Sequence, residues 1–138
     1  MRVSRIFLTV DIVLFRKLDL ETQILLIKRK NEPFKEHWAL PGGFVDEGED
    51  IECAALRELK EETSIELFTL KQLGAFGKPN RDPRSHVVSI AYFGFVSSNT
   101  VAIANDDAKE AEWFYCNDLP KLAFDHIDII KKAIDLYI

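Results

Sequence analysis

Three glutamates in the middle of the chain, Glu58, Glu61 and Glu62, have the type and spacing that point most directly to chemistry. Residues three and four apart lie on one face of an α-helix, so a helix here would point the three carboxylates the same way. Carboxylates that close repel one another unless a cation lies between them. Because Mg²⁺ takes oxygen ligands and links carboxylates to substrate phosphates, the spacing favours a magnesium site.

A solvated acidic helix face is the simpler interpretation of the same segment. Residues 46–62 contain eight acids and two bases, a charge of −6, whereas the whole chain has a charge of −5. One short segment therefore carries the acidity of the protein. Arg57, four residues before Glu61, can pair with a neighbouring acid and hold it in place. The glutamates alone do not separate the two interpretations.

The residues that precede the glutamates favour the metal site. Gly43 is followed after five residues by Glu49, and Glu49 is followed after seven by Arg57-Glu58-Leu59-Lys60-Glu61-Glu62-Thr63-Ser64-Ile65. This pattern resembles the Nudix box, Gly-x5-Glu-x7-Arg-Glu-U-x-Glu-Glu-x-Gly-U with U aliphatic, at eight of its nine specified positions. Ser64 stands where the family has glycine, at what looks like a left-handed helix C-cap. Serine there should cost about 1 kcal/mol or shift the end of the helix.

The resemblance to Nudix hydrolases covers the whole chain and implies a set of metal ligands. Those implied ligands are the side chains of Glu58, Glu61 and Glu62 and the backbone carbonyl of Gly43. Arg57 and Glu49 would be the pair that orients the helix against the preceding loop. The implied cofactor is Mg²⁺, with Mn²⁺ as a substitute.

The reaction that the resemblance implies is attack of a metal-activated water on a phosphorus of a diphosphate. Glu58, Glu61 and Arg57 would belong to the catalytic machinery. The general base varies within the family, so several acids stay open. They are a glutamate of the box, Asp106, Asp107 and Glu110, of which Asp107 is included in the expected catalytic set.

A polar loop carrying Arg81, Arg84 and His86 points to the class of substrate. Together with residues 122–126, it resembles segments of ADP-ribose pyrophosphatases and of Nudix-related regulators of NAD metabolism. Two arginines can clamp phosphate or ribose oxygens. The alternative is that Asp82 pairs with one of them and only braces the loop.

An adenine ring needs an aromatic or apolar platform. Trp38, Phe34, Phe44 and Phe76 are the candidates, and Trp38 is included in the expected substrate site with the two arginines and His86. His86, His37 and His126 also have ordinary structural interpretations. Most of the ten phenylalanines must be core residues.

Three functions follow from these observations. The first is hydrolysis of ADP-ribose to AMP and ribose 5-phosphate. The second is a MutT-type (deoxy)nucleoside triphosphate pyrophosphohydrolase, which shares the box but should not need the Arg81 and Arg84 loop. The third is a non-catalytic sensor of ADP-ribose. The related regulators carry a winged-helix region after the Nudix domain, and we expect none here because the chain ends at Ile138.

The site must be positioned by a mixed sheet and two helices. Alternation and turn residues predict strands at 3–15, 24–27, 38–40, 68–76, 87–96 and 110–116, of which the first two form a hairpin and 87–96 is central. Helices are expected at 49–63, with Asp50 as N-cap and Ile51, Ala55 and Leu59 as a buried stripe, and at 124–137. The expected class is α+β: an α/β/α sandwich with the Nudix fold, a mixed sheet between helices, as one domain over 1–138.

Composition limits the partners and the location. The charge of −5 makes nucleic acid an unexpected partner, so a small nucleoside diphosphate derivative is expected instead. No segment has the length to span a membrane and no signal peptide is visible, so we expect a cytoplasmic protein. Cys53 and Cys116 are expected to be small buried residues and not a disulfide. Related enzymes are commonly dimers, and the long apolar first strand is compatible with a homodimer.

Overall fold

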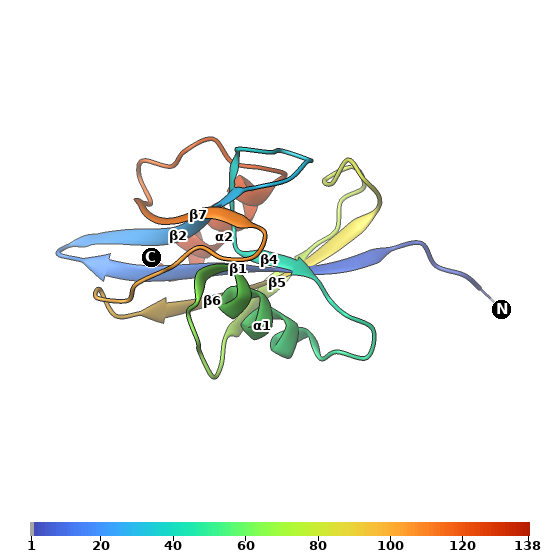
Figure 1. The fold of residues 1–138 in the computed structure, drawn as a ribbon. Helices are drawn as coiled ribbons and strands as arrows, with labels where there is room; N and C mark the ends of the chain where they lie inside the picture. Colours follow the sequence, from blue (N-terminus) through green and yellow to red (C-terminus); the bar gives the residue numbers. More distant parts are fainter. Residues whose placement is uncertain (1) are drawn as a thin grey trace.

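The computed structural model describes residues 2–138 as a central sheet with a helix on either side (Figure 1). In chain order the elements are β1 (Phe7–Leu18), β2 (Glu21–Arg29), β3 (Trp38–Ala39), β4 (Gly42–Phe44), α1 (Ile51–Thr63), β5 (Lys71–Phe76), β6 (Val87–Val96), β7 (Ala108–Tyr115) and α2 (His126–Tyr137). Within residues 2–138, no helix is long and apolar enough to cross a membrane.

The sheet is mixed, and β1 is its central strand. β1 pairs antiparallel with β2, which confirms the predicted hairpin, and parallel with β6 over the whole length of β6. β6, predicted to be central, is an interior strand between β1 and β5, next to the central strand β1. β3 and β7 pair with β2, while the short β4 pairs with β1. The α+β class with a mixed sheet is therefore confirmed.

The two faces of β1 contribute to two different cores. Val10, Ile12 and Leu14 face α1, whereas Val13 and Phe15 face α2, and all five are fully buried. The helix residues in these cores are Ala54, Ala55 and Leu59 of α1 and Ile129, Ile130 and Ala133 of α2. Each fully buried aliphatic or aromatic side chain of this size contributes about 1.5–3 kcal/mol. α1 is thus fixed on one face of the sheet, and the C-terminal half of the helix carries Glu58, Glu61 and Glu62.

Several element boundaries differ from the prediction. β1 begins at Phe7, because residues 2–6 are exposed and lie outside its ladder with β6. Residues 42–44, which lie outside the predicted strands, form β4 because they pair with residues 9–11. α2 begins at His126 and not at Phe124, whose backbone φ of 51° is not helical.

Ser64 ends α1 in the left-handed conformation, with φ 65° and ψ 7°. Its backbone N–H donates to the Lys60 carbonyl at 2.9 Å, and its hydroxyl donates to the Ile103 carbonyl at 3.1 Å. The helix end is therefore not shifted, and the hydroxyl bond offsets part of the conformational cost of serine. The prediction that both cysteines are buried is wrong for Cys53, which lies exposed on α1, while Cys116 is half-buried.

Candidate active site

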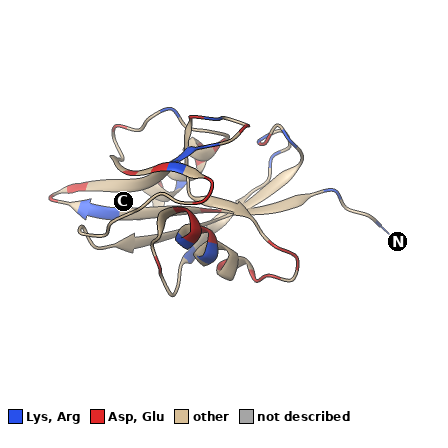
Figure 2. Ribbon diagram, viewed as in Figure 1, with Lys and Arg blue, Asp and Glu red and all other residues tan. Residues whose placement is uncertain are grey.

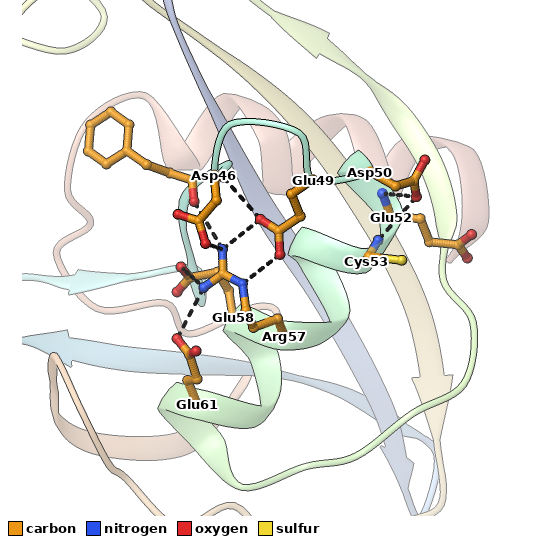
Figure 3. Close-up of polar contacts among 9 residues, drawn as sticks. Asp46, Glu49, Asp50, Glu52, Cys53, Arg57, Glu58 and Glu61 are labelled. Carbon is orange, nitrogen blue, oxygen red and sulfur yellow. Dashed lines mark hydrogen bonds and ion pairs between the residues drawn. The ribbon is translucent and has the colours of Figure 1, made fainter.

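The glutamates are positioned by a well-capped helix. The Asp50 carboxylate accepts hydrogen bonds from the backbone N–H groups of Glu52 and Cys53, at 3.1 and 3.3 Å (Figure 3). This confirms the predicted N-cap, which satisfies two of the free N–H groups at the start of a helix. Acidic residues follow along α1 and the loop that enters it (Figure 2).

Arg57 connects this helix to the loop before it. Its Nε and Nη2 donate to the two carboxylate oxygens of Glu49 at 2.7 and 2.9 Å, and Nη2 also donates to the Phe44 carbonyl (Figure 3). Nη1 donates to Glu58 at 2.9 Å and to Glu61 at 3.2 Å. The hydrogen bonds from Arg57 lower the pKa of Glu49 to about 2. The paired placement of Arg57 and Glu49 agrees with the role that the resemblance implies for them.

Glu62 and Glu58 flank the glycine turn, by which we mean the bend at Pro41 and the first two residues of β4, Gly42 and Gly43. Glu62 is only 5% exposed, and its carboxylate accepts the backbone N–H of Gly42 at 2.8 Å. Burial, reinforced by the negative charges of Glu58 and Asp107, raises the pKa of Glu62 well above its ordinary value. A Cβ atom on Gly43 would lie 2.6 Å from the Glu58 carboxyl carbon, so a larger residue there would displace that carboxylate.

A cavity of about 360 Å³ opens beside the glycine turn. Its acidic lining residues are Asp11, Glu32, Asp46, Glu58, Glu62, Asp82 and Asp107. Its basic lining residues are Arg29, Lys30, Arg81, Arg84 and His126, and Phe44 and Phe124 supply aromatic rings. Carboxylates and guanidinium groups therefore face one space, which fits a ligand that brings phosphate groups together with a cation.

The two arginines of the predicted substrate loop have different environments. The Arg84 guanidinium lies 5.1 Å from the ring centroid of Phe44 and 5.7 Å from that of Phe124, and it pairs with Asp82 at 2.7 Å. Arg81 is almost fully buried and donates from both Nε and Nη2 to Asp125, the residue that precedes α2. The pairing of Asp82 with an arginine, the alternative weighed from the sequence, is present for Arg84.

Two of the expected substrate residues lie away from the cavity lining. Trp38 is in β3, with its ring against Phe114 at a centroid distance of 4.8 Å. His86 lies beside the Gly77 carbonyl at 3.2 Å. Both positions follow from strand pairing, which directs Trp38 into the α2-side core and His86 toward the end of β5. Asp107, by contrast, lines the cavity as its predicted role requires.

The structure adds cavity residues that the sequence pattern did not single out as site residues. Arg29, at the end of β2, lies 5.0 Å from the Phe124 ring centroid, and both burial and the charge of Arg84 lower its pKa. Two cations held this close favour an anionic ligand. Asp11 was the one visible signal, because it is an acid inside an otherwise apolar strand. His126 and Phe124 gave none, since a histidine or phenylalanine at a helix start is usually structural.

The donor chemistry around the glycine turn fits a hard divalent cation. The available groups are carboxylate and carbonyl oxygens, and the raised pKa values of Glu58 and Glu62 reflect buried negative charge. In the described part of the chain, no three His, Cys, Asp or Glu side chains are gathered as a ready-made metal cluster. Arg57 contacts both Glu58 and Glu61.

Comparison with known proteins gives the same assignment as the box. The chain is 54% identical to an ADP-ribose pyrophosphatase of Methanocaldococcus jannaschii over 114 residues, which are 83% of this chain and 67% of that protein. The structure superposes with a TM-score of 0.91 on the NUDIX domain of Shewanella oneidensis NrtR complexed with ADP ribose, at 34% identity over 99% of this chain and 91% of that one.

A third similar structure is a bifunctional NMN adenylyltransferase/ADP ribose pyrophosphatase from Francisella tularensis, complexed with AMP and a manganese ion. Its TM-score is 0.80 at 31% identity, over 94% of this chain and 41% of that one. The family model of the NUDIX domain matches residues 7–133, which include every strand, all of α1 and residues 126–133 of α2. This chain therefore belongs to the NUDIX family.

Proposed function

We propose that this protein hydrolyses the pyrophosphate bond of ADP-ribose, yielding AMP and ribose 5-phosphate, with Mg²⁺ as cofactor and Mn²⁺ as a substitute. One observation carries the proposal. The Glu62 carboxylate and the Gly42 N–H are joined at 2.8 Å beside Glu58, at the edge of a cavity that also presents arginines. Such a site can hold a cation and a diphosphate side by side.

The residues that would hold the metal are those of the box. They are Glu58, Glu61, Glu62 and the backbone carbonyl of Gly43. A bound divalent cation would lower the pKa of water and neutralise charge on the diphosphate oxygens. Arg57 would balance the same carboxylates when the cation is absent, because its guanidinium already bonds to Glu58 and Glu61.

The remaining residues bind the substrate and move a proton. Arg84 would bind phosphate or ribose oxygens, and the neighbouring ring of Phe44 or Phe124 can support a planar base. Asp107 faces the cavity and is a candidate to accept the proton of the attacking water. Arg57 and Glu49 hold α1 and the glycine turn in fixed relation, which keeps these groups aligned.

The choice of ADP-ribose is supported by what similar proteins are. The archaeal relative is an ADP-ribose pyrophosphatase, and the NrtR domain of nearly the same fold is complexed with ADP ribose. NrtR also supports the sensor as a second candidate, since another of its structures is complexed with DNA. The arrangement of Glu58 and Glu62 beside the glycine turn favours the enzyme, because buried acids cost stability without a cation to bind.

A substrate panel tests the proposal. ADP-ribose, other nucleoside diphosphate derivatives and (deoxy)nucleoside triphosphates are incubated with the protein and Mg²⁺ or Mn²⁺, and the products are identified by mass. AMP and ribose 5-phosphate from ADP-ribose, at the highest kcat/KM of the panel, are the expected result. Preference for a triphosphate would establish the MutT-type function. Tight binding of ADP-ribose without turnover would establish the sensor.

A homodimer is a further part of this proposal. Val3, Ile6 and Phe7, around the start of β1, are more than half exposed, and the N-terminal arm extends away from the sheet (Figure 1). Exposed apolar residues of this kind are typical of contact surfaces. Sedimentation of the protein gives the oligomeric state, and a monomer at all concentrations would remove this part of the proposal.

A further inference from the structure

A chain of buried polar side chains runs beneath the active site, outside the box. It joins Asp11 of β1, Ser89 of β6 and His126 at the start of α2, which are 7%, 0% and 4% exposed. The Ser89 hydroxyl donates to Oδ2 of Asp11, and His126 Nε2 lies 3.4 Å from Oδ1 of the same carboxylate. Buried polar groups are costly unless they are paired, so three of them in contact call for an explanation.

The other ring nitrogen of His126 contacts the polypeptide backbone at Leu40, just before the glycine turn. The backbone N–H of Leu40 donates to Nδ1 at 3.0 Å, so Nδ1 carries no proton. The neutral ring must then carry its proton on Nε2, on the side that faces Asp11. Burial lowers the pKa of His126, which agrees with a neutral ring. His126 therefore bridges Leu40 and Asp11 in one defined tautomer.

The turn from Leu40 to Gly43 is held on several sides. Leu40 is held by His126, the Pro41 carbonyl accepts the N–H of Ile12 at 2.8 Å, and Gly42 donates to Glu62. The Asp11 carboxylate packs directly against Gly42, because a Cβ atom on Gly42 would lie 2.7 Å from Asp11 Oδ1. The placement of this turn relative to α1 thus depends on Asp11 and His126, two of the three buried polar side chains described above.

We propose that Asp11 and His126 are positioning residues, which hold the Leu40–Gly43 turn where the Gly43 carbonyl and the Glu62 carboxylate can serve one ion. The metal part of this inference rests on the proposed function. Ser89 supports it by fixing the Asp11 carboxylate from the other side. Groups that orient metal ligands typically change metal affinity by about 10–100-fold when they are removed.

Two replacements of His126 separate its two contacts. Asparagine places an acceptor near the position of Nδ1 and keeps a partner for the Leu40 N–H, whereas glutamine places its amide near Nε2 and leaves that N–H unpaired. We expect His126→Gln to weaken Mn²⁺ binding about tenfold, and to speed hydrogen exchange at the Leu40 and Gly42 amides. His126→Asn should recover most of both properties. His37→Asn, at a half-buried histidine outside the cavity lining, is the matched control and should change neither.

Asp11→Asn and the milder Ser89→Ala test the other two members of this group of buried polar side chains. They also keep the proposal testable if a His126 variant fails to fold. Both should weaken Mn²⁺ binding in the absence of substrate, with the larger effect for Asp11→Asn. If the folded variants bind Mn²⁺ and protect these amides as the wild type does, and only melt earlier, the side chains are structural and the proposal is overturned. A raised KM for Asp11→Asn with unchanged Mn²⁺ affinity would also overturn it, since Asp11 would then contact substrate directly.

The readouts also distinguish this inference from the proposed function. Mn²⁺ binding and amide exchange are both measured without substrate, so they do not depend on ADP-ribose being cleaved. A wild-type protein that binds Mn²⁺ but cleaves no nucleoside diphosphate derivative would sink the proposed function and leave the positioning roles supported. A wild-type protein that binds no Mn²⁺ would overturn both.

Discussion

The carboxylate of Glu62 accepts the backbone N–H of Gly42 at 2.8 Å, which joins the last turn of α1 to the glycine turn twenty residues earlier. The bond places an almost fully buried charge beside the cavity. A buried carboxylate without a cation is costly, so this contact is a place where stability has been given up for function.

Replacing Glu62 by glutamine should therefore separate stability from activity. Glutamine keeps an oxygen for the Gly42 N–H but no charge, so the melting temperature should not fall while turnover of ADP-ribose falls by about 100-fold or more. Steady-state kinetics and thermal melting measure the two effects. Glu66→Gln, which removes an exposed partner of Lys60, is the control and should change neither. Near-normal rates for Glu62→Gln with excess Mg²⁺ would contradict the ligand assignment.

The Glu49–Arg57 pair should make stability depend on acid pH. The pKa of Glu49 in the folded protein is about 2, below its ordinary value of 4.5, because Arg57 and the Asp46 N–H bind the charged form. A lowered folded-state pKa contributes stability that is fully present above pH 4.5 and is lost as the pH falls toward about 2.

Urea unfolding of the wild type and Glu49→Gln across this range measures that contribution. The wild type should be more stable above pH 4.5, and the difference between the two should shrink steadily toward about pH 2. Glu47→Gln, at an exposed neighbouring position, should match the wild type throughout. A Glu49→Gln difference that does not vary with pH would show that the ion pair makes no net contribution.

Arg81 should contribute more to the stability of the fold than to substrate binding. Its guanidinium is almost fully buried against Asp125, and Arg81→Ala would leave that carboxylate without its partner. The free energy of unfolding should fall by about 3 kcal/mol, and the double variant Arg81→Ala/Asp125→Asn should recover part of the loss. Denaturant unfolding measures both. A large rise in KM with unchanged stability would instead place Arg81 on the substrate.

Arg84 should show the opposite behaviour. Its guanidinium faces the cavity between Phe44 and Phe124, so Arg84→Ala should raise KM for ADP-ribose by about tenfold, and by less for a simple triphosphate. Steady-state kinetics on both substrates provide the test. Arg5→Ala, at an exposed position before β1, is the control. Equal effects on the two substrates would assign Arg84 to bracing its loop through Asp82.

Ser64 allows the cost of the unusual helix cap to be measured. Glycine adopts φ 65° without strain, so Ser64→Gly should stabilise the protein by less than about 1 kcal/mol, because the hydroxyl bond to Ile103 is lost. Ser64→Ala loses the same bond and keeps the strain, so it should be the least stable of the three. Thermal unfolding ranks them, and an alanine variant as stable as the glycine variant would show that the cap is unstrained.

The sequence by itself determined the features that depend on local spacing. The Asp50 cap, the buried stripe through Ala55 and Leu59 and the pairing of Arg57 with Glu49 all lie within about two turns of one helix and its entry loop. Helical periodicity fixes such relationships before any tertiary contact forms. The hairpin of β1 and β2 is of the same kind, because its strands are adjacent in the chain.

Only the tertiary structure decided which distant residues share the cavity. Asp11 meets the glycine turn because β1 pairs with β4 and places Asp11 opposite Gly42, and His126 meets it because its ring accepts the Leu40 N–H. Arg29, at the end of β2, lines the same cavity. The pairing of β3 with β2 places Trp38 against a hydrophobic core, and the tertiary structure brings Arg81 to Asp125. Sequence periodicity specifies which face of an element is apolar but not which elements become neighbours. Strand order and register decide which elements become neighbours, because only the correct arrangement buries both faces of β1 at the same time.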